Sequence, residues 1–188
     1  MPPSTPNQYP PTAAFNEIIE IKVGENEAAK SFHMHKGILC FYSGYFKSAL
    51  DGNFSEARTG VMHLPTEDSE VFEMFQYWAY QRRLCDPSQR DVEAISWLRL
   101  AQLWVFGDAR QIPLLQNEVM DLHRKKVVEL WQIPTGSVDH AYSHTCVNSP
   151  LRRFILDVLA NTGGTDQVKS YRLESFSQEA LVDLLTAV

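Results

Sequence analysis

Two groups of residues have a spacing that could bind a metal ion. His33 and His35 alternate along a segment with the two-residue period of a β-strand, so both imidazoles can lie on one face of it. His140 and His144 are four residues apart, as on one face of a helix, and Cys146 follows closely. Because imidazole nitrogen and thiolate sulfur are ligands that zinc prefers, the second group raises the hypothesis of a small zinc-dependent enzyme.

Each group also has an interpretation that needs no metal. His35 leads directly into a predicted helix, where a buried imidazole can hydrogen-bond backbone groups. His140, His144 and Cys146 have no evident fourth ligand and no general base beside them, so the two histidines equally suit a polar helix face. We favour the structural interpretation of both groups and expect no cofactor and no bound metal.

The sequence has no motif of the common catalytic or nucleotide-binding classes. It has no Gly-x-Gly-x-x-Gly, no phosphate-binding loop, no Gly-x-Ser-x-Gly and no His-Glu-x-x-His. These absences argue against dehydrogenases, kinases, serine hydrolases and zinc proteases. We therefore expect no enzymatic activity and no small-molecule substrate.

Composition and charge indicate a globular chain that binds neither nucleic acid nor membranes. The chain has 188 residues and a net charge of −6, and its basic cluster is Arg124-Lys125-Lys126, which we interpret as a solvated face at the negative end of a helix. No window approaches about 18 consecutive apolar residues. The N-terminus does not resemble a secretory signal, so we interpret the three cysteines as free thiols and expect an intracellular protein, cytoplasmic or nuclear.

Apolar residues predict a small sheet followed by many helices. Residues 1–14 contain five of the ten prolines and are expected to be a disordered or polyproline-like lead-in. A period of two predicts a hairpin of strands 18–23 and 31–35, with a third short strand at 61–64. A helical period predicts two short helices, at 36–41 and 45–50. It also predicts later helices that begin at Asp68 or Ser69, Asp91, Ile112, Ser137, Ser149 and Ser177. This order is typical of an α+β fold rather than a doubly wound nucleotide-binding fold.

Several motifs in the first two-thirds of the chain resemble the BTB (POZ) domain. Their order and spacing carry the resemblance, and its motif residues, which we expect to be structural, are Phe32, His35, Lys36, Leu39, Ser43, Phe46 and Glu56. The resemblance implies a hairpin and a short strand surrounded by helices. It divides the chain into the lead-in, a BTB/POZ domain over 15–127 and an all-helical extension over 128–188. Residues 131–135 and 148–154 resemble the helical tail of filamentous-fungal BTB proteins.

The resemblance implies a protein–protein interaction module that forms homo- or hetero-complexes, with a cullin-RING ubiquitin-ligase adaptor as an alternative. The prolines before Glu17 predict that the extra N-terminal dimerisation helix of some members is missing, as in adaptor subunits of the Skp and elongin C type. Gly52 stands where cullin-binding members often have Glu, which counts against a cullin partner.

The predicted partner contacts lie at the end of the helix that finishes near residue 50. They are Leu50, Asp51, Asn53 and Phe54, with Phe54 as an apolar anchor and Asp51 as a charge at the rim. Phe54 equally suits an ordinary core position.

Overall fold

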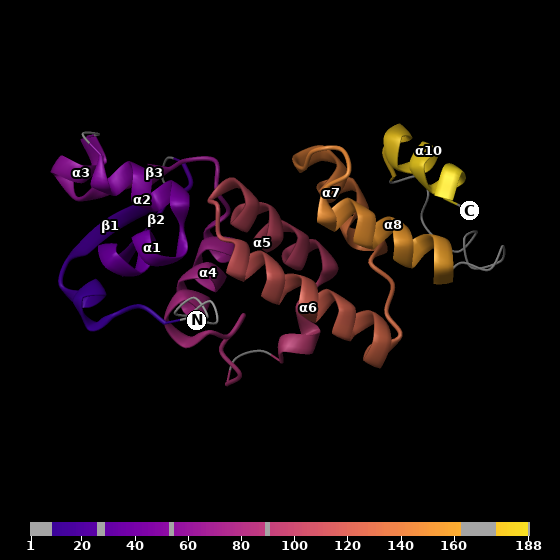
Figure 1. Cartoon of the computed structure of the whole chain (residues 1–188), viewed down its shortest axis with the longest axis horizontal. Helices are drawn as coiled ribbons and strands as arrows, with labels where there is room; N and C mark the ends of the chain where they lie inside the picture. Colours follow the sequence, from indigo (N-terminus) through magenta and orange to yellow (C-terminus); the bar gives the residue numbers. More distant parts are fainter. Residues whose placement is uncertain (1–8, 26–28, 53–54, 89–90, 163–175, 188) are drawn as a thin grey trace, which may run out of the picture. The chain divides into compact units, whose positions relative to one another are not determined.

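The chain divides into two compact units. A computed structural model describes residues 9–25, 29–52, 55–88, 91–162 and 176–187 (Figure 1). The first unit holds the residues up to Arg82 together with Arg110–Ile112, and the second holds Arg83–Ala109 and the residues from Pro113 onward.

A three-stranded sheet forms the base of the first unit. β1 (Ile18–Val23) is the central strand, antiparallel to β2 (Lys30–His35) and parallel to β3 (Val61–Leu64). Ile19, Ile21 and Val23 face inward and are at most 3% exposed. The predicted hairpin and third strand are therefore confirmed.

Helices surround this sheet and supply aromatic side chains to its core. They are the 3-10 helix η1 (Thr12–Phe15), α1 (Lys36–Tyr42), α2 (Gly44–Asp51), α3 (Ser55–Thr59) and α4 (Ser69–Gln81). Phe46 of α2 stacks on Phe75 of α4 at a centroid distance of 6.0 Å, and both are fully buried. The α+β class predicted from the sequence is confirmed.

Ser43 joins three parts of the first unit. Its hydroxyl accepts a hydrogen bond from the Phe46 backbone N–H at 3.0 Å, which caps α2. The same hydroxyl donates to the Arg110 carbonyl at 2.5 Å. The Gly44 N–H donates to the Gln111 carbonyl at 3.2 Å, so Ser43 and Gly44 hold residues 110 and 111 against the start of α2.

The second unit is helical throughout its described elements. These are the 3-10 helices η3 (Val92–Ala94) and η4 (Thr135–Ser137), and the α-helices α5 (Trp97–Ala109), α6 (Pro113–Leu130), α7 (Val138–His144), α8 (Pro150–Thr162) and α10 (Gln178–Ala187). The predicted helix start at Ser149-Pro150 is confirmed, because the Ser149 hydroxyl accepts a hydrogen bond from the Arg152 N–H at 3.2 Å.

The predicted helix start at Asp91 is wrong. The Asp91 carboxylate does cap a turn, accepting from the Glu93 N–H at 3.0 Å, but that turn is the short η3. Ile95 then has extended backbone angles, φ −62° and ψ 125°, which interrupt the helix. The long helix begins at Trp97, and Leu98 in its first turn is 43% exposed.

The basic cluster is not a uniformly solvated face, because Lys126 is only 2% exposed. Its ammonium group donates to the carbonyls of Glu93 at 2.7 Å and Ile95 at 2.8 Å. Lys125 forms an ion pair with the Glu93 carboxylate at 2.8 Å. These two lysines therefore fasten η3 to the end of α6, and the sequence interpretation was wrong for Lys126.

A neutral histidine lies in the core of the second unit. His123 of α6 is fully buried, with its ring stacked on Trp97 at 5.3 Å and against Phe154 of α8 at 5.5 Å. Its Nδ1 is 3.0 Å from the Val119 carbonyl, and its Nε2 has no partner among the described residues. Burial, only partly opposed by this hydrogen bond, lowers the pKa of His123 from 6.5 to about 4.

We expect Ser43→Ala to destabilise the chain by about 1–3 kcal/mol, because it removes the α2 cap and leaves a buried N–H and a carbonyl without their partner. Urea unfolding of the full chain, followed by circular dichroism, measures the change. Ser48→Ala is the matched control, since Ser48 is exposed on the same helix. Equal stability of the two variants would contradict the role given to Ser43.

We expect acid to weaken the second unit through His123. The unfolded chain binds a proton at this ring below pH 6.5, whereas the folded chain does so only near pH 4. The neutral ring therefore does not lower the free energy of unfolding above pH 6.5. As the pH drops from 6.5 to 4, this free energy falls by up to about 3 kcal/mol.

Urea midpoints between pH 7.5 and pH 4, followed by tryptophan fluorescence, measure this slope. His123→Gln should flatten the profile, whereas His63→Gln, at an exposed histidine, should leave it unchanged. Parallel profiles for the wild-type chain and His123→Gln would rule out His123 as the source.

Candidate partner-binding site

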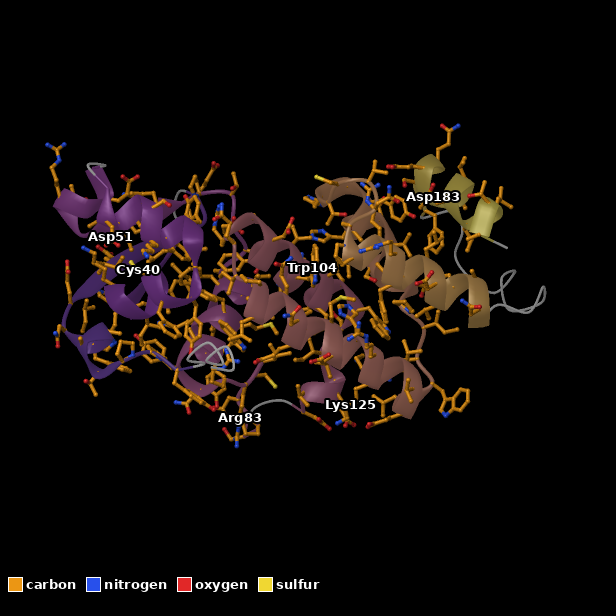
Figure 2. All side chains as sticks on the ribbon, viewed as in Figure 1. Cys40, Asp51, Arg83, Trp104, Lys125 and Asp183 are labelled. Carbon is orange, nitrogen blue, oxygen red and sulfur yellow. The ribbon has the colours of Figure 1, made fainter. Side chains whose placement is uncertain are left out.

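The four predicted contact residues at the end of α2 differ in their exposure and in whether the structure describes them. Leu50 is 1% exposed and lies in the core of the first unit. Asp51, labelled in Figure 2, is exposed at the last residue of the helix. Asn53 and Phe54 lie outside the described residues. The structure thus places one candidate, Asp51, at the surface.

The BTB-type motif residues have structural positions. Leu39 and Phe46 are fully buried, and Phe32 packs on Phe72 at a centroid distance of 4.8 Å. Ser43 caps α2, and Glu56 lies half-buried in α3.

His35 bridges the hairpin and α4. Its Nδ1 is 2.8 Å from the Tyr80 hydroxyl, and its backbone N–H donates to the same oxygen at 3.0 Å. The Gln76 side-chain amide also donates to the His33 carbonyl at 3.1 Å. Side chains of α4 therefore satisfy outward-facing backbone groups of β2, which covers part of this sheet edge.

Three apolar side chains form an exposed surface around His35. Phe15, Ile18 and Tyr80 are 46%, 60% and 36% exposed, respectively. The Phe15 and Tyr80 rings lie 5.3 Å and 5.8 Å from the His35 ring, and Ile18 is paired with His35 across the hairpin. We call Phe15, Ile18, His35 and Tyr80 the His35 patch.

The position of η1 depends on a close backbone approach. A Cβ atom at Gly37 of α1 would lie 2.4 Å from the Ala14 Cα, so only glycine allows η1 to pack this closely on α1. Ala14 is 7% exposed at this contact, and Phe15 follows it on the surface. The aromatic ring is thus held in the His35 patch by the fold rather than left on a free chain end.

The charges beside the His35 patch neutralise one another. The Lys36 ammonium group lies 3.6 Å from the Glu17 carboxylate, and the Lys36 backbone N–H donates to the Glu17 carbonyl at 2.8 Å. The apolar surface therefore has a charge-balanced pair next to it.

The patterns in the sequence did not predict the His35 patch. Ile18 gave one signal, because it has the opposite parity to the inward-facing Ile19, Ile21 and Val23 of the same strand. Phe15 is the first residue of the predicted BTB/POZ domain and Tyr80 lies near the end of α4, so neither position by itself predicts a partner contact. Only the fold brings these distant residues together.

Of the three possible zinc ligands, the structure brings the two histidines close together. The His140 and His144 rings stack at 4.1 Å, and His144 Nδ1 is 3.0 Å from the His140 carbonyl. Burial, with a smaller contribution from His144, lowers the pKa of His140. Cys146 is exposed, and the described part of the chain contains no group of three or more His, Cys, Asp or Glu that could hold a metal ion.

Two further findings concern the cysteines and the described helices. All three cysteines are free thiols, and burial is the main cause that raises the pKa of Cys40. Among the described helices, none combines the length and apolar character needed to cross a membrane.

Comparison with known proteins identifies the fold. A scan against protein families matches residues 19–111 to the BTB/POZ domain, the region that contains the sheet, α1 to α4 and α5. A search of curated proteins found no match. Residues 19–111 of this chain are therefore a BTB/POZ domain, a protein–protein interaction module.

Proposed function

We propose that the chain is a non-enzymatic interaction subunit and that its BTB/POZ domain associates with a second copy through the His35 patch. The observation that carries this proposal is the exposure of Phe15, Ile18 and Tyr80 on one contiguous surface. Apolar and aromatic side chains contribute most of the binding energy at the centres of protein interfaces.

The charges favour a second copy over a strongly charged partner. In a twofold interface the same surface faces itself, so unbalanced charge would repel. The Glu17–Lys36 pair beside the patch is charge-balanced. Two copies of the patch can therefore approach with these two charges already neutralised in each copy.

The other functional hypotheses receive less support. A cullin adaptor would depend on the end of α2, where Asp51 is the exposed candidate and Gly52 replaces the usual Glu. A zinc-dependent enzyme is not favoured by the stacked His140 and His144. A fungal origin and the division into 15–127 and 128–188 remain proposals that rest on the sequence motifs.

We expect Ile18→Glu to weaken self-association at least about tenfold, because it puts a carboxylate in the centre of an apolar interface. Sedimentation velocity over a concentration series measures the change. Ile18 is already 60% exposed, so the variant should keep its circular dichroism spectrum and thermal midpoint.

Val147→Glu is the matched control, because Val147 is 67% exposed but lies between α7 and α8. It should leave self-association unchanged. An Ile18→Glu chain with the wild-type mass distribution, or a wild-type chain that stays monomeric, would contradict self-association through the His35 patch.

A further inference from the structure

The second unit contains a groove between α6 and α8 that the proposed function does not use. Both helices are labelled in Figure 1, and the space between them has a volume of about 650 Å³. Its lining residues are Asn117, Met120, Asp121, Arg124, Pro150, Arg153, Phe154 and Asp157.

Each helix lines this groove with residues of a single helix face. α6 contributes residues 117, 120, 121 and 124, and α8 contributes residues 150, 153, 154 and 157. Both sets follow the i, i+3, i+4, i+7 spacing of a single helix face. Two parallel rows of this kind form the usual seat for a third helix.

Two large apolar side chains, Met120 and Phe154, lie among the mostly polar residues that line the groove. Met120 is 8% exposed, and half-buried Phe154 packs against the buried His123 ring at a centroid distance of 5.5 Å. A docking helix would therefore contact these two supported apolar side chains and, around them, polar and charged ones.

The charged residues on the two sides of the groove differ in whether they form ion pairs. On α6, Arg124 forms an ion pair with Asp121 at 3.2 Å. On α8, the exposed side chains of Arg153 and Asp157 have no ion pair or hydrogen bond with any residue that the structure describes. One unpaired cation and one unpaired anion thus stand four residues apart on the same exposed stripe.

We propose that this groove binds α8 of a second copy, in antiparallel orientation. Residues 153 and 157 are separated by about 6 Å along the helix axis. A twofold axis that passes midway between them places Arg153 opposite the partner's Asp157, and Asp157 opposite the partner's Arg153. Both ion pairs form together, and neither like-charged pair is brought into contact.

Charge complementarity favours a second copy over other occupants. A purely acidic or purely basic partner would place a like charge against Asp157 or Arg153. A second α8 supplies both charges at the required spacing, because in antiparallel orientation each basic residue faces an acidic residue of the other copy.

The decisive experiment is a charge exchange made in the Ile18→Glu background, which removes the His35 patch as a source of association. Sedimentation velocity up to about 100 micromolar should show dimers of Ile18→Glu. Arg153→Glu or Asp157→Arg should each weaken that dimer about tenfold or more, since each places like charges together. The double variant Arg153→Glu/Asp157→Arg should restore the dimer to within about threefold of the background.

Arg58→Glu is the matched control, because Arg58 is exposed on α3 of the first unit. It should leave the dimer unchanged. Any of three results would overturn the proposal: a monomeric Ile18→Glu chain, two single variants without effect, or a double variant that does not recover dimerisation. If the single variants have no effect, the groove would instead suit a helix of another protein. Because every variant in this experiment carries Ile18→Glu, its result tests the α8 contact independently of the His35 patch.

Discussion

The buried hydroxyl of Ser43 is the contact on which the first unit depends. A hydroxyl can accept and donate at once, and here it caps α2 while it holds the Arg110 carbonyl. The Arg110 guanidinium also pairs with Glu67 and lies over the Tyr45 ring at 4.4 Å. Residues 110–112 therefore belong to the first unit although they follow α5 in the sequence. The family match likewise starts in β1 and continues past α5 to residue 111.

A buried cation has the corresponding role in the second unit. Arg152 is 6% exposed, and its guanidinium donates to the Tyr142 carbonyl at 2.6 Å and to the Glu179 carboxylate at 2.7 Å. The Tyr142 hydroxyl in turn donates to Asp183, labelled in Figure 2, at 3.0 Å. These contacts join α7, α8 and α10, and they fix the rotation of α8 about its axis. With Arg152 turned inward, Arg153 lies about 100° further round the helix and lines the groove.

Local patterns predicted the elements better than they predicted the surfaces. The hairpin, the helix start at Ser149 and the α+β class follow from short-range periodicity and capping, so the sequence was sufficient to predict them. The burial of Lys126 was not predictable in this way, because its partners are carbonyls more than thirty residues away. The same limit applies to the candidate site. Asp51 is exposed and its partner contact stays a prediction, whereas the apolar surface around His35 arises only when η1, the hairpin and α4 meet.

The two proposed contact surfaces have a combined geometric consequence. Each is isologous, so each alone closes a pair of chains and then stops. A chain that carries two independent isologous surfaces joins one neighbour through the His35 patch and another through α8, which produces an open series unless the symmetry axes happen to close a ring. The two surfaces rely on different physics, since one is apolar with a neutralised rim and the other is held by exposed ion pairs. Added salt screens the second far more than the first, so ionic strength would shorten the series by opening the α8 contacts while the His35 pairs persist.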